Sequence, residues 1–299
     1  MPSDRPTYRL FGERAVPVDE ALSPPEPTAF GATDAGPARD RNEDHFLVAR
    51  IERRLVAEAA SVETARGATL LDAPSGLLMV VADGIGARAG GDIAAAVTVD
   101  AIADHLLRWM PWLSATDATV ETALTGALRT AFAEAQKHLR DVAQRKSLDA
   151  KLGTTLTMIY ARWPTAYVAH VGDSRAYLFR GEEVYRLTRD HNLAEQMVDR
   201  GVLTSEEAKR TRFASVLTNA VGGSEDTLQV ELHRVALAKG DRLLLCSDGL
   251  YAPLDDDAIA ARVQQVSRGD LVQPCVEALL KDAADAGSTD NITAVLATF

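Results

Sequence analysis

Acidic residues stand at several places where an apolar segment begins or ends beside a small or turn-forming residue. Four such sites are Glu43-Asp44, Asp83-Gly84, Asp248-Gly249 and Asp290-Asn291. A cap or a turn explains any one of them taken alone. Asp83 is harder to explain this way, because it follows residues 77–82, an apolar segment that predicts a strand buried on both faces. A carboxylate at the end of such a strand is partly buried, and a buried charge needs a partner.

If these strand ends converge, their carboxylates repel one another. The repulsion is about 4 kcal/mol for two unit charges about 4 Å apart at an effective dielectric of about 20. Divalent cations would relieve it, and oxygen ligands without cysteine or clustered histidine favour Mg²⁺ or Mn²⁺ over zinc or copper. Two ions bridged by one carboxylate would lower the pKa of a shared water and supply hydroxide near neutral pH. This chemistry suits the hydrolysis of phosphate esters.

Composition limits the class of protein. The chain has 299 residues, of which 46% are hydrophobic and 25% charged, so it can bury a full core. Its formal net charge of −11 opposes long-range attraction to nucleic acid or to an anionic membrane. Cys246 and Cys275 form no CxxC pair, which fits a reducing compartment. With no signal-peptide pattern and no apolar run long enough to span a bilayer, we expect a soluble cytoplasmic protein.

The positions of proline and glycine and the hydrophobic periodicity predict an N-terminal tail followed by one domain. Residues 1–28 carry six of the twelve prolines and predict a flexible tail, whereas residues 29–299 contain no linker and predict a single domain. Helical spacing marks residues 92–109, 118–144, 191–200, 205–209, 255–266 and 270–285. Strand patterns mark residues 46–49, 77–82, 154–161, 166–179, 184–187, 229–235, 241–246 and 291–298, and residues 51–74 are expected to form a long hairpin. Hairpins between helix pairs favour an α+β fold with antiparallel sheets flanked by helices.

Seven segments follow one another in the order of the motifs of one family. They are residues 39–44 (RDRNED), 81–86 with 90–92 (VADGIG and GGD), 152–156 (LGTTL), 171–177 (VGDSRAY), 187–191 (LTRDH), 246–250 (CSDGL) and 288–293 (STDNIT). In these segments the chain resembles the PPM (PP2C-like) metal-dependent protein serine/threonine phosphatases, in their bacterial form. The resemblance implies a four-layer α-β-β-α sandwich with two central antiparallel sheets. It also implies hydrolysis of phosphoserine and phosphothreonine by direct attack of a metal-bridging hydroxide.

The resemblance implies a metal ligand set. Asp83 would bridge two Mn²⁺ or Mg²⁺ ions, the Gly84 carbonyl would bind one of them, and Asp248 and Asp290 would bind the other. Asp173 would join Asp248 at a third, weaker metal site, although a simple turn also explains Asp173. Mn²⁺ and Mg²⁺ are not distinguished.

The resemblance also implies roles around the metals. Glu43 and Asp44 would hold metal-bound waters, and Arg39 would bind the substrate phosphate, which suits a guanidinium fork, although Arg39 also fits an ordinary surface residue. Ile85 stands where eukaryotic members often have a histidine, a proposed general acid, so protonation of the leaving group would fall to a water or, as the less favoured alternative, to another side chain. The partners implied are phosphorylated proteins, substrates of a serine/threonine kinase, acted on by a monomer.

Other phosphate chemistries fit less well. Residues 84–89 match a dinucleotide fingerprint, but Asp83 would face the pyrophosphate and no repeated βαβ units follow. A P-loop would need lysine where Asp92 stands. A cysteine-based phosphatase needs arginine six positions after its cysteine, where Ala252 and Lys281 stand instead.

Two questions stay open at the level of the sequence. His45, His170 and His191 have no zinc spacing, and His170 is expected to be a packed or hydrogen-bonded core residue. Residues 205–213 carry a basic run that either steers a phosphopeptide or forms a solvated helix face.

The same fold could also serve as a phosphoprotein-binding module without turnover, which an assay for Mn²⁺-dependent hydrolysis of p-nitrophenyl phosphate would distinguish.

Overall fold

A computed structural model describes most of the chain. The described residues are 26–51, 55–56, 69–70, 76–86, 90–108, 118–149, 152–208, 211–223, 228–267 and 269–299. The expected tail lies outside them up to residue 25, as does most of the expected hairpin. Within that hairpin, β3 (Leu55–Val56) pairs antiparallel with β4 (Thr69–Leu70), as a hairpin requires.

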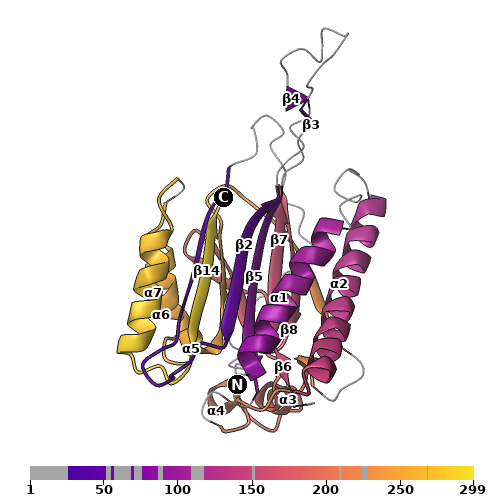
Figure 1. The fold of residues 1–299 in the computed structure, drawn as a ribbon. Coiled ribbons are helices and arrows are strands. Elements are labelled where there is room, and N and C mark those ends of the chain that lie inside the picture. The colour runs from indigo at the N-terminus through magenta and orange to yellow at the C-terminus, as the bar shows by residue number, and fades with distance from the viewer. Residues whose placement is uncertain are drawn as a thin grey trace.

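Two antiparallel sheets form the centre of the described structure (Figure 1). The first has the order β11-β6-β5-β7-β8-β12, with β2 also paired to β5. Its strands are β2 (Asp44–Ile51), β5 (Gly76–Ile85), β6 (Gly153–Thr154), β7 (Leu156–Arg162), β8 (Thr165–Val171), β11 (Val221–Gly222) and β12 (Glu231–Ala236). The second has the order β1-β14-β13-β9-β10, with β1 (Thr28–Asp34), β9 (Arg175–Arg180), β10 (Glu183–Arg186), β13 (Arg242–Cys246) and β14 (Ile292–Thr298).

Helices cover the outer face of each sheet. α1 (Gly90–Arg108) and α2 (Ala118–Arg145) lie on the first sheet, and α6 (Asp256–Val263) and α7 (Gln273–Asp285) lie on the second (Figure 1). Three short helices, α3 (Leu193–Asp199), α4 (Ser205–Ala208) and α5 (Asp248–Tyr251), lie toward the lower end of the view. Among the described residues, none of the helices has the length and apolar character needed to cross a bilayer.

The alternation of side chains along the central strands explains the layers. On β5, Leu78 and Val80 pack against α1 and α2, while Met79 and Val81 pack between the sheets. On β13, Leu244 faces the helices of the other side. Each sheet is therefore apolar on both faces and needs a layer on each. The resulting order of layers, helix–sheet–sheet–helix, confirms the predicted α+β fold.

One predicted strand was wrong. Residues 166–179 do not form a continuous strand, because β8 belongs to the first sheet and β9 to the second. The break comes at Gly172, whose φ of 110° favours glycine and where a Cβ would lie 2.6 Å from the Thr155 side chain. The chain therefore crosses between the sheets at Gly172, and Asp173 lies in the crossing.

Element ends differ from the predicted ones by a few residues. β5 runs to Ile85, so Asp83 and Gly84 lie within the strand rather than after it. Asp255 is the N-cap of α6, where its side chain accepts from the Ala258 N–H, so it precedes the helix. α7 begins at Gln273 rather than residue 270, with Pro274 in its first turn, a position that suits proline. The short elements β1, β11 and α5 were not predicted.

Candidate active site

Asp83 and Asp44 face each other across two strands. Asp44, the first residue of β2, is the register partner of Asp83 near the end of β5. The backbone of Asp83 is held from the next strand: its N–H donates to Thr155 Oγ1 (2.9 Å), and its carbonyl accepts from Thr154 Oγ1 (2.8 Å) and from the Thr155 N–H (2.9 Å). The GTT segment therefore fixes the position of Asp83.

Asp44 links the two sheets. It is 3% exposed, and its Oδ2 accepts from Ser247 Oγ at 2.7 Å and from Thr293 Oγ1 at 2.6 Å. Ser247 follows β13 and Thr293 belongs to β14, so both donors come from the second sheet. Neither hydroxyl was singled out from the sequence, although both lie in the CSDGL and STDNIT segments. They position Asp44 and hold the strand ends together.

Asp248 and Asp173 complete what we call the carboxylate cluster, defined as Asp44, Asp83, Asp173 and Asp248. Asp248 is the first residue of α5, and its buried Oδ1 has no hydrogen-bond partner among the described residues. Asp173 is 7% exposed, and its carbonyl accepts from the Tyr251 hydroxyl at 3.0 Å. One turn of α5 thus carries Asp248 and also the tyrosine that holds Asp173.

Burial and neighbouring carboxylates raise the pKa of all four members of the carboxylate cluster. Burial, and after it the charges of Asp44 and Asp248, hold the pKa of Asp83 well above the usual range. Burial and Asp248 do the same to the pKa of Asp173. Burial raises the pKa of Asp44 to about 6 and, together with Asp290, that of Asp248 to about 7. Groups that resist ionisation in one another's presence need positive charge to become carboxylates.

This donor set fits hard divalent cations. Every side-chain donor of the cluster is an oxygen, as Mg²⁺ and Mn²⁺ prefer. The Asp248 Oδ1 atom is a buried acceptor that lacks a donor, which an ion would satisfy. Gly84 also fits a backbone ligand position, since a Cβ there would lie 2.2 Å from the Gly91 carbonyl oxygen. The strand and the start of α1 can approach this closely only at glycine.

Arg39 and Asp290 contact each other. The Arg39 Nη2 group lies 2.6 Å from Asp290 Oδ2, and its Nε donates to the Thr289 carbonyl at 3.2 Å. Their side chains are 51% and 36% exposed, so this pair forms the rim of the carboxylate cluster. Two residues to which the sequence assigned separate roles therefore form one ion pair. Neither contact uses Nη1.

Glu43 is positioned by an asparagine from the other end of the chain. Its N–H donates to Asn291 Oδ1 at 2.8 Å, and Asn291 Nδ2 donates to the carbonyls of Ala35 and Arg41, both at 2.8 Å. Burial raises the pKa of Glu43, although Arg39 opposes this. Asn291 was noted in sequence only as the neighbour of Asp290. Its three bonds show that it holds the loop that carries Arg39 and Glu43.

Two other features that the sequence singled out are Ile85 and the basic run within residues 205–213. Ile85 is 37% exposed at the end of β5, which leaves an apolar side chain beside Asp83 and Gly84. In the basic run, Lys209 and Arg210 lie outside the described residues, and Arg212 is exposed and lies over the Phe213 ring at 5.5 Å.

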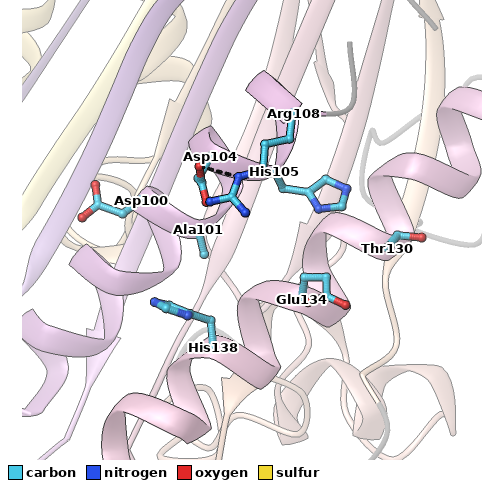
Figure 2. A pocket seen from close by; sticks show the side chains of 8 residues that line it. All are labelled: Asp100, Ala101, Asp104, His105, Arg108, Thr130, Glu134 and His138. Atoms are coloured by element: carbon cyan, nitrogen blue, oxygen red, sulfur yellow. Dashed lines mark hydrogen bonds and ion pairs between the residues drawn. The ribbon is translucent and has the colours of Figure 1, made fainter. Parts of the chain in front are cut away.

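A separate polar cavity lies between α1 and α2, away from the carboxylate cluster. Its volume is about 680 Å³, and Figure 2 shows the side chains that line it from both helices. Asp104 and Arg108 pair within it at 2.6 Å, and the His105 and His138 rings point in different directions. The cavity does not contain any of the residues that the sequence singled out.

Comparison with known proteins agrees with this arrangement. The family model described as Protein phosphatase 2C matches residues 68–296, and the chain belongs to this family of metal-dependent phosphatases. It is 32% identical to the protein phosphatase PhpP of Streptococcus pneumoniae over 225 residues, which cover 73% of this chain and 84% of PhpP. It is 33% identical to the serine/threonine protein phosphatase PstP of Mycobacterium tuberculosis, covering 74% of this chain and 40% of PstP.

Solved structures agree with the fold. The catalytic domain of PstP in complex with two manganese ions superposes with a TM-score of 0.70 at 28% identity, covering 91% of this chain and 97% of that one. The chain is thus a serine/threonine protein phosphatase of the PP2C type.

Proposed function

We propose that this chain hydrolyses phosphoserine and phosphothreonine in proteins with two Mn²⁺ or Mg²⁺ ions held by the carboxylate cluster. The observation that carries the proposal is the convergence of four acids whose pKa values are raised first by burial and then by neighbouring carboxylates. The names of PhpP and PstP, and the two manganese ions in the PstP structure, support the same substrate class and metal.

The ligand roles follow the positions of the donors. Asp83 is the proposed bridge between the two ions, with the Gly84 carbonyl on one ion and Asp248 and Asp290 on the other. Asp173, which lies beside Asp248 across the crossing between the sheets, is the proposed ligand of a third and weaker site. Bound ions would supply, near neutral pH, the hydroxide for direct attack on phosphorus, with no covalent enzyme intermediate.

The other residues hold water and substrate. Glu43 and Asp44 are proposed to hold metal-bound waters, and the hydrogen bonds to Asp44 from Ser247 and Thr293 keep its Oδ2 in place. Arg39 is proposed to bind the phosphate, since its contacts with Thr289 and Asp290 do not involve Nη1. Ile85 cannot donate a proton, so water is the proposed donor to the leaving group.

We propose residues 29–299 as the catalytic unit, with a tail before it. β1 supports this boundary because it begins at Thr28 and pairs along its whole length with β14, from Thr28↔Thr298 to Asp34↔Ile292. Phosphorylated proteins, made by a serine/threonine kinase, are the proposed partners.

The test is turnover with metal added back. Purified protein is treated with EDTA and assayed with p-nitrophenyl phosphate and with phosphoserine, phosphothreonine and phosphotyrosine peptides, with and without Mn²⁺ or Mg²⁺. We expect activity only with metal, and faster release of phosphate from the phosphoserine and phosphothreonine peptides. A folded protein that binds these peptides but releases no phosphate with any metal would instead be a phosphoprotein-binding module.

A further inference from the structure

A second group of titratable side chains, with His170 buried and the others partly buried, lies next to the crossing at Gly172. His170 is the penultimate residue of β8, His191 follows β10, and Glu231 begins β12, yet ligand atoms of the three lie within 4.8 Å of one another. The two imidazole rings have centroids 4.7 Å apart. His233 also contacts Glu231. We call these four residues the histidine cluster. Distance alone would make it a candidate metal site.

The hydrogen bonds of the two rings argue against a metal. The Gly172 N–H points at His191 Nδ1 (3.2 Å), so that nitrogen must accept and the proton is on Nε2, which faces Glu231 Oε2 at 3.4 Å. His170 Nε2 faces the Arg189 carbonyl at 2.9 Å and must donate, which leaves Nδ1 as the acceptor for the Thr157 hydroxyl at 2.8 Å. Each ring therefore already uses its one lone pair, which a metal ion would need.

His191 instead joins two loops. On one side, its N–H donates to the Gly172 carbonyl at 2.7 Å while its ring accepts from the Gly172 N–H, so both polar groups of Gly172 are bound by one residue. Gly172 directly precedes Asp173 and has the left-handed φ of 110°. The conformation that places Asp173 is therefore held by His191.

On the other side, His191 closes the base of what we call the α3–α4 segment, residues 192–219, described except for 209–210. The Thr218 N–H donates to the His191 carbonyl at 2.8 Å, and Asn219 Nδ2 lies 3.0 Å from His191 Nδ1. Just beyond, Asn192 and Leu217 form an isolated β-bridge. Both ends of the α3–α4 segment therefore lie next to His191.

We propose that His191 is a positioning residue that sets the α3–α4 segment and the Asp173 loop in one fixed relation. The proposal rests on the function proposed above, because Asp173 matters only if it binds metal. Its consequence is that one side chain affects both the weakest proposed metal site, through Gly172, and the α3–α4 segment, which contains the basic run that the sequence links to phosphopeptide steering. A substrate too small to reach the segment would be affected only through the metal.

The variants separate positioning from general stability. His191→Ala removes the acceptor for the Gly172 N–H and for Asn219, whereas His191→Asn puts an amide oxygen close to the place of Nδ1 and keeps both bonds. His233→Ala is the matched control, since it removes an imidazole from the same cluster without contact to Gly172 through any bond of the described structure. Losing one hydrogen bond of about 1 kcal/mol corresponds to about fivefold in an equilibrium constant.

Three measurements are made on the whole chain. In metal-free protein, hydrogen exchange at the amides of Gly172 and Thr218 should be about fivefold faster in His191→Ala than in wild type. Calorimetric titration with Mn²⁺ should show the weakest site about fivefold weaker, and KM for a phosphothreonine peptide of about ten residues should rise by a similar factor. At saturating Mn²⁺, kcat for p-nitrophenyl phosphate should stay within about twofold of wild type. His191→Asn should recover most of each change.

The outcomes are distinguishable. If wild type lacks phosphatase activity, the proposed function fails whatever the variants do. If wild type is active and His191→Ala exchanges, binds Mn²⁺ and cleaves peptide as wild type does, the positioning role is wrong. Equal effects of His191→Ala and His233→Ala, with no recovery in His191→Asn, would also overturn it, because the cluster would then contribute only to general stability.

Discussion

Each of the two clusters, the carboxylate cluster and the histidine cluster, combines buried and partly buried side chains and adjoins the crossing at Gly172, but they differ in how their polar atoms are satisfied. In the carboxylate cluster the members oppose one another's ionisation, and Asp248 Oδ1 has no donor among the described residues. In the histidine cluster, both ring nitrogens of His170 and both ring nitrogens of His191 have a polar partner. Burial alone would raise the pKa of Glu231, but hydrogen bonds from His191 and His233 lower it below its usual value.

The difference shows what distinguishes a metal site from a hydrogen-bonded cluster that only holds loops together. Ligand atoms of His170, His191 and Glu231 lie within 4.8 Å of one another, and yet the lone pairs of the two rings are taken. In the carboxylate cluster, burial and neighbouring acids oppose ionisation, and a bound cation would stabilise the ionised form. Accounting for donors and acceptors therefore separates the two clusters where distance does not.

The largest expected effect comes from removing one carboxylate from each cluster. Asp248→Asn should lower kcat by about a thousandfold, since losing a metal ligand removes several kcal/mol of charge stabilisation. Glu231→Gln, the same kind of change in the histidine cluster, keeps an acceptor for His191 and should leave kcat within about twofold. Steady-state assays at saturating Mn²⁺, with circular dichroism as the folding control, measure both. Comparable losses in the two variants would remove the distinction between the clusters.

The second effect is a pH dependence of stability in which the clusters act in opposite directions. Folded-state pKa values of about 6 for Asp44 and about 7 for Asp248 exceed the ordinary value of 3.8, so the unfolded chain loses these protons first as pH rises. Their contribution destabilises the fold progressively between about pH 4 and pH 7. For His170, burial and then His191 lower the pKa from 6.5 to about 4, so its contribution is lost as pH falls through that window.

Four carboxylates outweigh one histidine, so the metal-free protein should lose several kcal/mol of unfolding free energy between pH 4.5 and pH 7. Asp83→Asn should reduce this loss, because it removes the acid whose pKa is raised by the most neighbours. Saturating Mn²⁺ should abolish it in wild type but not in the variant. Urea unfolding in EDTA over this range tests the prediction, and a stability that is constant or rises with pH would contradict it.

The third effect is on the rim of the carboxylate cluster. Arg39→Ala should raise KM by about tenfold, because a charge-assisted hydrogen bond to phosphate contributes about 1.5 kcal/mol or more. Stability should change little, since the pair with Asp290 is half exposed and such pairs contribute little. Arg50→Ala is the matched control, an exposed arginine paired with Glu26 instead. An unchanged KM in Arg39→Ala would exclude the phosphate role.

Local patterns were enough to predict most of the elements and the importance of Asp83. The apolar segment before Asp83 predicts a strand buried on both faces, and β5 is such a strand. They were not enough for residues 166–179, because β8 and β9 are both apolar strands and periodicity does not say which sheet each joins. Only the left-handed conformation at Gly172 marks the change of sheet, and glycine in a sequence does not state its φ.

Contacts between distant parts of the chain could not be predicted from local patterns. Arg39 and Asp290 are 251 residues apart, and Asp44 and Thr293 are 249 apart. The motif resemblance implied that Arg39, Asp44 and Asp290 lie near one site, but it did not indicate that Arg39 pairs with a proposed metal ligand or that Thr293 binds Asp44. His170, expected to be a hydrogen-bonded core residue, is 0% exposed and has both ring nitrogens bonded, which confirms that prediction.

The smallest expected effect comes from two threonines that are close in sequence but serve different clusters. Thr155 and Thr157 are 1% and 0% exposed. Thr155 Oγ1 accepts from the Asp83 N–H, whereas Thr157 Oγ1 lies 2.8 Å from His170 Nδ1. Thr155→Val should therefore lower kcat by about fivefold, the equivalent of one hydrogen bond of about 1 kcal/mol that positions Asp83. Thr157→Val should leave kcat within about twofold but lower the unfolding free energy by about 1 kcal/mol or more, because His170 keeps an unsatisfied buried acceptor.

This pair isolates function from stability, because both substitutions remove one buried hydroxyl and add one methyl. Urea unfolding gives the unfolding free energy of each variant, and steady-state kinetics gives its kcat. We expect Thr155→Val to have the lower kcat, whereas Thr157→Val should lose unfolding free energy without a comparable loss of kcat. If Thr157→Val lost activity as strongly as Thr155→Val at equal stability, the histidine cluster would contribute to the reaction itself, and a purely structural role would be excluded. If neither lost activity, the backbone of Asp83 would be fixed by the Thr154 hydroxyl and the β5–β6 pairing without help from Thr155.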